Sequence, residues 1–388
     1  MRSVTGDDAV FYYRTNNKTE GIVALHVDDF LAVGSPIFFE NVMKNIKTAF
    51  KFSKIEQNEF RFCGIDIKVS QDGIVMGQNE YVNNIDEIDL EKGADNEKPL
   101  NKQEFKNYRK ATGQIIWAAS QTRPDLGYDS LEMSYRNKDA KIKDIKNANK
   151  IIKKAKSKES FVTFNKIGKL EELKLVVYTD ASHLTIEGKT KGVAGRMIFL
   201  SNKEENRMSP LEWKAKTIVQ VCKSAKAAET RAADLATDEG LFLARAIAEI
   251  YTGKKGRQQI PMIVKSDSKS LKDSLNSTKQ VEERTMRPVI EHLKQMIARK
   301  EITEFNWVDT KSCHADILTK KGVAAEKILD IFQSGKTMWW EYYSYHYSFI
   351  VIIIVLVQTE KTENREKRET EKKKTEKEFY TNMLHFIL

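Results

Sequence analysis

Six acidic residues lie at points in the sequence where their carboxylates could hold divalent metal ions. Each one ends or interrupts an apolar run, or stands alone among small side chains: Asp28, Asp29, Asp180, Glu229, Asp267 and Asp316. Carboxylate oxygens are the ligands that Mg²⁺ prefers, and ions held in this way can catalyse phosphoryl chemistry. A lone Asp or Glu is more often a solvated surface group, so what matters is whether folding brings these residues together.

The first two carboxylates, Asp28 and Asp29, are adjacent in LHVDDFLAVGS. Residues 22–25 and 30–33 are short apolar, β-favouring runs, and they predict two strands joined by a tight turn that carries both aspartates. Asp tolerates turn conformations, so the local pattern alone favours a plain hairpin turn. A divalent cation would relieve the repulsion between the two carboxylates, as in phosphoryl-transfer sites, so both interpretations remain open at this point.

The other four carboxylates lie in a stretch that alternates strands with helices. Strands are expected at residues 174–182, at 192–201 and around Trp213, and a long helix at 223–250. A strand at 261–267, a helix from 268 to 275, a strand at 302–310 and a helix opening within 312–322 follow. The order β-β-β-α-β-α-β-α predicts a mixed sheet covered by helices.

The long helix carries one carboxylate on an otherwise small-residue face, whose members recur at intervals of three or four: Ala225, Glu229, Ala232, Ala236, Gly240 and Leu243. Small side chains let a helix pack closely on a sheet, and an unpaired charge held there is costly, so Glu229 needs a cation. We expect the sheet to bring Glu229 together with Asp180, Asp267 and Asp316, which gives enough oxygen ligands for two magnesium ions.

The 388 residues carry a formal net charge of +10, which suits an acidic partner such as nucleic acid. Residues 137–159 are dense in lysine, and apolar side chains recur there at helical spacing. This pattern predicts a solvated amphipathic helix, and equally a surface whose lysines contact phosphates; the candidates are Lys146, Lys150, Lys153 and Lys154. Three cysteines without a CxxC pair suggest neither a disulfide framework nor a zinc site, and the N-terminus lacks a secretory pattern.

Three ordered blocks in the first half resemble copia-type retrotransposon polyproteins. HVDDFLAVG resembles the (Tyr/Phe/His)-Val-Asp-Asp hairpin of reverse transcriptases. FRFCGIDIKVSQDGIVMGQNEYVNNI and YRKATGQIIWAASQTRPDLGYDSLEMS are similar to the two blocks that follow it in that family. The resemblance implies that Asp28 and Asp29 are polymerase metal ligands. It also implies a third aspartate and fingers upstream, and Asp7 and Asp8 lack the pattern of that earlier strand, so we expect a C-terminal remnant of a reverse transcriptase that cannot extend a primer.

The second half resembles the ribonuclease H domain that ends the same polyproteins. The matching segments are YTDAS, PLEWKAKTIVQVCKSAKAAETRA, SDSKSLKDSL and HADILTKKG. The resemblance implies that Asp180, Glu229, Asp267 and Asp316 hold two Mg²⁺ ions, with Mn²⁺ as an alternative. It implies an endonuclease that hydrolyses the RNA strand of RNA–DNA hybrids. The expected fold class is α/β with a ribonuclease H-like mixed sheet, preceded by an α+β palm and thumb remnant.

Departures from the family pattern leave alternatives open. Thr230 and Arg231 follow the helix glutamate where the family often has an aromatic residue, and an arginine there could perturb the site. Cys313 and His314 are adjacent but lack further ligands, so we assign them neither a metal nor a product-release role. The main alternative is a decayed or repurposed fragment that only binds nucleic acid. An integrase fits less well, because its carboxylate set does not use a glutamate on this helix.

We divide the chain into residues 1–135, a reverse transcriptase remnant, 136–172, a lysine-rich helical connection, 173–335, the ribonuclease H-like domain, and 336–388. The last segment fits neither domain. It holds an apolar run at residues 349–357 and a Glu/Lys-rich tail, and we interpret it as unselected sequence or, alternatively, as a membrane anchor with a basic tail. Cytoplasm or nucleus is the expected location.

Overall fold

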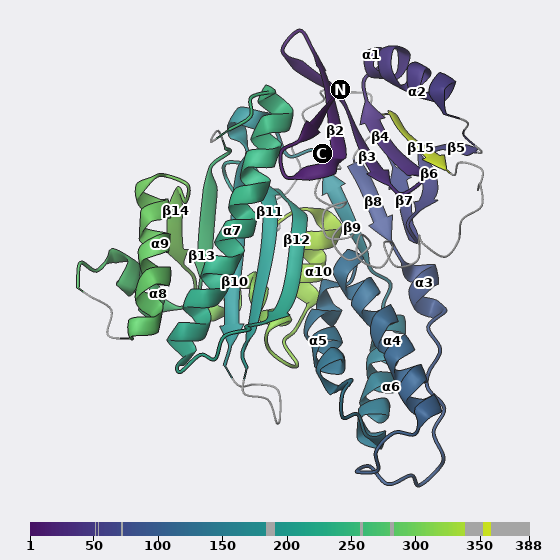
Figure 1. The fold of residues 1–388 in the computed structure, drawn as a ribbon, viewed down its shortest axis with the longest axis vertical. Helices are drawn as coiled ribbons and strands as arrows, with labels where there is room; N and C mark the ends of the chain where they lie inside the picture. The colour runs from purple at the N-terminus through teal and green to yellow at the C-terminus, as the bar shows by residue number, and fades with distance from the viewer. Residues whose placement is uncertain are drawn as a thin grey trace.

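The computed structural model describes residues 1–50, 52, 54–70, 73–183, 191–256, 259–279 and 283–337, and the backbone of 352–357. Three sheets organise the described chain (Figure 1). An N-terminal sheet has the order β1-β2-β3-β4-β15-β5, a middle sheet the order β6-β7-β8-β9, and a C-terminal sheet the order β12-β11-β10-β13-β14. The fold is therefore mixed α and β, as expected from the sequence.

The N-terminal sheet is built from short strands that pair antiparallel: β1 (Arg2–Val4), β2 (Asp7–Thr15), β3 (Lys18–His26), β4 (Asp29–Gly34), β5 (Lys54–Gln57) and β15 (Ile352–Val357). Strand β15 lies between β4 and β5 and pairs with both. Our expectation that the apolar run fits neither domain is therefore wrong for Ile352–Val357. A short apolar run does not reveal its partner from sequence alone, because pairing is decided by tertiary contacts.

The hairpin that carries the two adjacent aspartates is confirmed. Strands β3 and β4 pair with Leu25 opposite Phe30 and His26 opposite Asp29, so the turn consists of Val27 and Asp28. Asp29, which we expected in the turn, is instead the first residue of β4. Val27 has a φ of 53° and a side chain that is 56% exposed. A β-branched residue with positive φ is strained, so the turn stores conformational energy beside the aspartates.

The middle sheet and a group of helices form the next part of the chain. The strands are β6 (Glu59–Phe62), β7 (Ile65–Val69), β8 (Gly73–Gly77) and β9 (Phe161–Asn165); the helices are α1 (Pro36–Phe38), α2 (Lys44–Ala49), α3 (Asn79–Asn83), α4 (Lys102–Gln121), α5 (Gly127–Arg136) and α6 (Ile142–Lys156). A π-helical turn, Phe39–Met43, joins α1 to α2. Helix α6 is the lysine-dense segment, and its apolar face is buried in one cluster with α4, as its spacing predicts.

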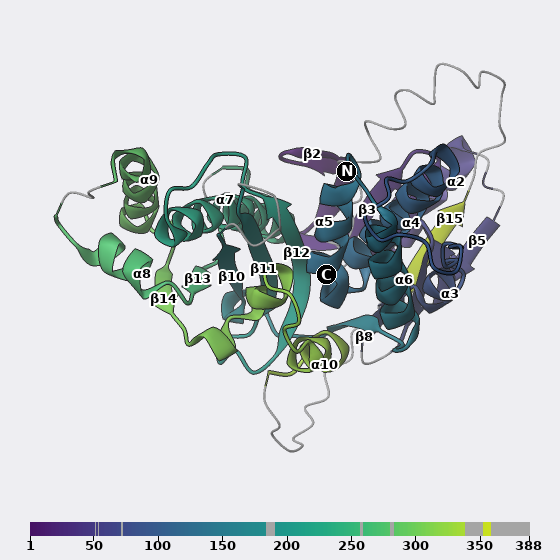
Figure 2. The same cartoon turned by 90° about the horizontal axis from the view of Figure 1, so that it is seen from below.

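The C-terminal sheet is mixed, as expected. Strands β10 (Lys174–Ser182), β11 (Val193–Ser201) and β12 (Met208–Thr217) are antiparallel neighbours, whereas β13 (Met262–Ser266) and β14 (Glu304–Trp307) run parallel to β10. Helices α7 (Ala225–Thr252), α8 (Lys269–Asn276), α9 (Arg287–Ala298) and α10 (Glu326–Ser334) complete this part. Figure 2 shows these elements in a lobe beside the one that holds α4 and α6.

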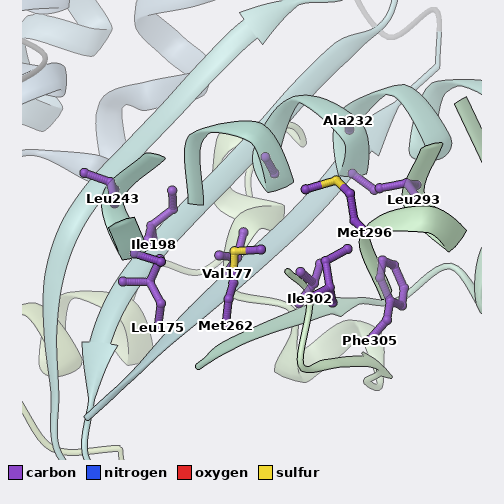
Figure 3. Close-up of a cluster of buried hydrophobic side chains, with 14 of the residues drawn as sticks. Leu175, Val177, Ile198, Ala232, Leu243, Met262, Leu293, Met296, Ile302 and Phe305 are labelled. Atoms are coloured by element: carbon purple, nitrogen blue, oxygen red, sulfur yellow. The ribbon is translucent and has the colours of Figure 1, made fainter. Parts of the chain in front are cut away.

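Both faces of the C-terminal sheet are covered. Leu175 and Val177 of β10 belong to the cluster under α7 and α9, where Figure 3 shows the side chains between helices and sheet. Val176 and Tyr178 alternate with them and join the cluster shared with α10 and the other two sheets. At Gly240 of α7 a Cβ would lie 2.8 Å from Val177 Cγ2. Helix and strand thus meet closely, as the small-residue face predicts.

The segment that carries Asp316 differs from the expectation. Residues His314–Leu318 form a 3₁₀ turn, and α10 begins only at Glu326, so the helix predicted to open within 312–322 is wrong. The physical reason is tight packing of this segment against β11, described below. The helix expected after Asp267 is confirmed as α8, and α9, which we did not expect, follows it before β14. Among the described residues no helix is both long and apolar enough to cross a membrane, and most of the proposed anchor lies outside those residues.

Candidate active site

Strand register places two of the predicted carboxylates side by side. In the parallel pair β10 and β13, Thr179 lies opposite Ser266, so Asp180 and Asp267 follow at the same edge of the sheet. The Asp180 side chain is fully buried. Thr310 donates a hydrogen bond of 2.8 Å from Oγ1 to Asp267 Oδ2, and the Trp307 indole donates to the Asp267 carbonyl at 2.9 Å. These contacts fix the Asp267 side chain and backbone beside Asp180.

A glycine makes room for the third carboxylate. Gly195 lies opposite Asp180 in the antiparallel pair β10 and β11. A Cβ at this position would lie 2.6 Å from Thr319 Cγ2 and 3.1 Å from the Ala315 carbonyl oxygen. The 3₁₀ turn therefore packs directly on β11, where a side chain on residue 195 would displace it. This close approach brings Asp316 and Thr319 to the site, and the Thr319 hydroxyl donates to Asp180.

The fourth carboxylate, Glu229, comes from the second turn of α7. Ser224 caps this helix, because its hydroxyl accepts a hydrogen bond from the Ala227 amide. Glu229 Oε1 accepts from the backbone amide of Ala181, the residue after Asp180, at 3.2 Å. The four predicted carboxylates therefore converge at one end of the C-terminal sheet, as the sequence analysis expected.

Sequence reasoning missed a lysine inside this cluster. Lys320 Nζ lies 3.0 Å from Asp316 Oδ2, 3.3 Å from Asp180 Oδ1 and 3.9 Å from Asp267 Oδ2. The side chain is 35% exposed, so Lys320 lies at the border between the cluster and solvent. In the sequence, Lys320 lies four residues after Asp316 within the matching segment HADILTKKG, a spacing that is typical of a surface ion pair on a helix.

The protonation behaviour of the carboxylates follows from their burial together. Burial raises the pKa of Glu229 to about 9, and repulsion from Asp180 and Asp267 adds to it. Burial and the charge of Asp316 raise the pKa of Asp180 to about 7, against the opposing effect of Lys320. Burial also raises the pKa of Asp316. Carboxylates held apart from water and close to each other either stay protonated or need nearby positive charge. Lys320 opposes the rise in pKa of Asp180, Glu229 and Asp316 but does not cancel it.

The residues fit a divalent cation by the chemistry of their donor atoms. Glu229 Oε2 and Asp316 Oδ1 are buried and have no hydrogen-bond partner among the described residues. Buried carboxylate oxygens without a donor are costly, and coordination to a hard cation would satisfy them. The described ligand atoms that lie within 4.8 Å of one another belong to Asp180, Asp267 and Cys313. Asp316 is linked to this set by its ion pair with Lys320, and Glu229 is linked to it by the hydrogen bond that it accepts from the Ala181 amide.

Cys313 and His314 have different surroundings, the first beside the carboxylates and the second in the core. The Cys313 thiol lies beside Asp180 and Asp267, and burial raises its pKa, so it is a neutral thiol, which hard cations do not favour. The His314 ring lies 4.3 Å from that of Tyr178, centroid to centroid, in the core cluster shared with α10. Burial lowers the pKa of His314 to about 3. His314 is therefore a neutral core residue.

The two residues after the helix glutamate do not supply the cation of the site. Thr230 is buried and donates back to the Lys226 carbonyl at 2.8 Å within α7. The charge of Arg231 opposes the rise in pKa that burial gives to Cys222, which follows β12. The perturbing positive charge expected from Arg231 is instead that of Lys320.

Asp28 and Asp29 lie in the N-terminal sheet, and neither is fully buried as Asp180 is. Both are partly exposed, at the strained hairpin turn of the N-terminal sheet. In the described part of the chain, neither belongs to a group of three residues that could jointly hold a metal ion. Their assignment as polymerase ligands therefore stays a prediction.

The four lysines predicted to bind nucleic acid lie on α6. Lys146 donates to Asn96 at 2.7 Å, Lys153 pairs with Glu87 at 3.2 Å, and Lys154 pairs with Asp129 at 2.8 Å. Lys150 is exposed on the same helix. These contacts satisfy part of the positive charge of α6, and nucleic-acid binding by this set stays a prediction.

A second basic surface, not predicted from the sequence, lies on α4. An open hollow of about 740 Å³ is lined by Lys102, Gln103, Phe105, Lys106, Arg109 and Lys110. The Arg109 guanidinium lies 5.9 Å from the centre of the Phe105 ring. Four cations and an aromatic ring on one helix face form a surface that suits a polyanion.

Comparison with known proteins finds distant relatives. No family model matches the sequence. The chain is 23% identical over 222 residues to the putative transposon Ty5-1 protein of Saccharomyces cerevisiae, a match that covers 53% of this chain and 69% of that protein.

Solved structures that match parts of the chain include ribonucleases H. The N-terminal RNase H domain of Rv2228c from Mycobacterium tuberculosis matches with 17% identity over 38% of this chain and 91% of its own, at a TM-score of 0.26. LC11-RNase H1 in complex with an RNA/DNA hybrid matches with 15% identity over 37% of this chain and 93% of its own, at a TM-score of 0.28. A foamy viral protease–reverse transcriptase in complex with an RNA/DNA hybrid matches with 14% identity over 70% of this chain and 31% of its own, at a TM-score of 0.36. These TM-scores are too low to support any inference about activity.

Proposed function

We propose that this chain is a retroelement-derived ribonuclease H that hydrolyses the RNA strand of RNA–DNA hybrids. The observation that carries the proposal is the convergence of Asp180, Glu229, Asp267 and Asp316, from four separate elements, at one end of a mixed five-stranded sheet. The distant similarity to a Ty5 transposon protein supports a retroelement origin. The proposal includes the ribonuclease H-like fold for residues 173–335 and a reverse transcriptase-like part before it.

The chain's own residues supply the site for this chemistry. Asp180 and Asp267 would hold Mg²⁺, with Asp316 and Glu229 completing the oxygen ligands. When bound, two such ions supply an activated water and stabilise the leaving oxygen. Thr310 and the Ala181 amide keep Asp267 and Glu229 in place by hydrogen bonds. Contacts to 2′-hydroxyls would select the RNA strand, since that group distinguishes RNA from DNA.

The basic faces of α4 and α6 would contact phosphates without reading sequence. Phosphate contacts supply most sequence-independent affinity, so binding should weaken steeply as salt rises. The four cations of the α4 hollow support this part of the proposal, together with Lys150 of α6.

One observation favours a second candidate, a fragment that binds nucleic acid without cutting it. The Lys320 ammonium contacts three of the four carboxylates, and a lysine in that position can replace a metal in a protein that needs none. The two candidates differ in whether the site binds divalent ions.

The test is incubation of the chain with a hybrid labelled on its RNA strand, in Mg²⁺ and separately in Mn²⁺. Duplex DNA and duplex RNA of the same sequence are the controls. The proposal predicts cuts in the RNA strand of the hybrid alone, abolished by EDTA. Equal cutting of duplex DNA would refute it, and retention of the hybrid without any cut would favour the binding-only candidate.

A further inference from the structure

Lys320 is a charged residue of the site that the proposed chemistry does not use. It follows Thr319, whose hydroxyl donates to Asp180, so its backbone is fixed at the edge of the site by the same 3₁₀ segment that carries Asp316. Its ammonium bridges Asp316 on that segment to Asp180 on β10 and lies 3.9 Å from Asp267 after β13. Three elements therefore meet at one positive charge.

The oxygens that Lys320 contacts are those that a divalent ion would use. Asp180 Oδ1, Asp267 Oδ2 and Asp316 Oδ2 all face the ammonium. An ammonium donates three hydrogen bonds, and here it has at least as many carboxylate neighbours. A cation placed among the same oxygens would lie next to the ammonium and be repelled by it.

We propose that Lys320 is an internal counter-ion of the carboxylate site, which holds the site together without metal and competes with divalent cations for it. The inference rests on the proposed function, because it assigns a regulator of metal occupancy to the same four carboxylates. The lysine is also compatible with activity: its side chain is 35% exposed, so it can turn toward solvent when a divalent ion takes its place. The site then responds to the concentration of free divalent ion.

The competition predicts a specific effect of Lys320→Met, which keeps the length and apolar stem of the side chain. This variant should bind Mn²⁺ about tenfold more tightly than wild type, because Mn²⁺ no longer has to displace the Lys320 ammonium. Without metal it should unfold at a lower temperature than wild type, and Mn²⁺ should raise its unfolding temperature by more. The measurements are Mn²⁺ binding by electron paramagnetic resonance and thermal unfolding, on the full chain without nucleic acid.

Matched variants separate local from general effects. Lys321→Met removes the same charge from the next residue, whose Nζ pairs with Glu132 at 3.1 Å, and should bind Mn²⁺ as wild type does. Lys320→Arg keeps the charge and should retain metal-free stability. If Lys320→Met folds only when Mn²⁺ is present, that result also supports the counter-ion.

The outcomes distinguish this inference from the proposed function. If Lys320→Met binds Mn²⁺ more tightly than wild type but the wild-type chain cuts no hybrid, the result would support the counter-ion and refute the nuclease. Equal Mn²⁺ affinity in Lys320→Met and wild type, with hybrid cleavage intact, would refute the counter-ion alone. If neither chain bound Mn²⁺, both would be refuted.

Discussion

The two acidic sites of this chain are assembled in opposite ways. Asp28 and Asp29 lie together because they are adjacent in sequence, and their hairpin leaves them partly exposed. The four C-terminal carboxylates come from β10, α7, the end of β13 and a 3₁₀ turn. They meet around Asp180, which is fully buried, and beside Asp316, which is also buried, so charge is costly there. Adjacent carboxylates follow from a turn alone, whereas carboxylates gathered from distant segments against their own repulsion need a cation to explain them.

The comparison predicts that the two sites contribute very differently to cleavage. Asp180→Asn removes a charge from the centre of the C-terminal cluster and should lower the rate of hybrid cleavage by about a thousandfold. The double variant Asp28→Asn with Asp29→Asn should cleave at the wild-type rate. Both would be measured with the labelled hybrid in Mg²⁺, after thermal unfolding has shown that each variant folds. A large loss in the double variant would mean that the two sites are not independent.

Removal of β15 should affect the N-terminal sheet and leave the C-terminal site intact. A chain that ends at Thr337 exposes the edges of β4 and β5 that pair with β15. Amides on those edges should exchange with solvent at least about tenfold faster, and the chain should self-associate more. Hydrogen exchange and light scattering measure these effects, with hybrid cleavage as the control. Unchanged exchange on β4 would show that β15 does not stabilise the sheet.

The pH dependence of stability should be specific to the C-terminal site. The pKa of Glu229 is raised from 4.5 to about 9 in the folded chain, so the folded state binds a proton that the unfolded state has already released. The free energy of unfolding should therefore fall as pH rises through this range in EDTA. Mg²⁺ should reduce the fall, and Glu229→Gln should remove the part due to this residue. Denaturant unfolding at a series of pH values tests this, and a steeper fall in Glu229→Gln would contradict it.

The smallest expected effect concerns the hairpin turn. Val27→Gly should stabilise the chain by about 1 kcal/mol, because glycine adopts positive φ without strain, although its greater freedom in the unfolded chain reduces the gain. Val33→Gly, in the regular part of β4, should destabilise the chain instead. Urea unfolding of both variants compares them. A loss of stability in Val27→Gly would show that the exposed valine makes contacts that outweigh its strain.

The sequence predicted the parts of the site that depend on local pattern. Apolar runs that end at Asp180 and Asp267 are strands, and the small-residue face around Glu229 packs on them. It did not predict that Asp316 lies on a 3₁₀ turn, since that depends on the space left by Gly195 on another strand. Lys320 was missed for the same reason, because its spacing from Asp316 fits an ordinary surface pair and only tertiary structure brings Asp180 to it.

The most direct test of the central claim is the separation of cutting from binding in Asp267→Asn. Asparagine keeps the shape and the hydrogen-bond acceptor for Thr310 but lacks the charge that Mg²⁺ requires. The variant should fold, bind the hybrid with nearly wild-type affinity through its phosphate contacts, and fail to cut the RNA strand. Asp330→Asn, which changes an exposed carboxylate on α10, should cut normally. A folded Asp267→Asn variant that cuts the RNA strand at the wild-type rate would contradict the four-carboxylate site.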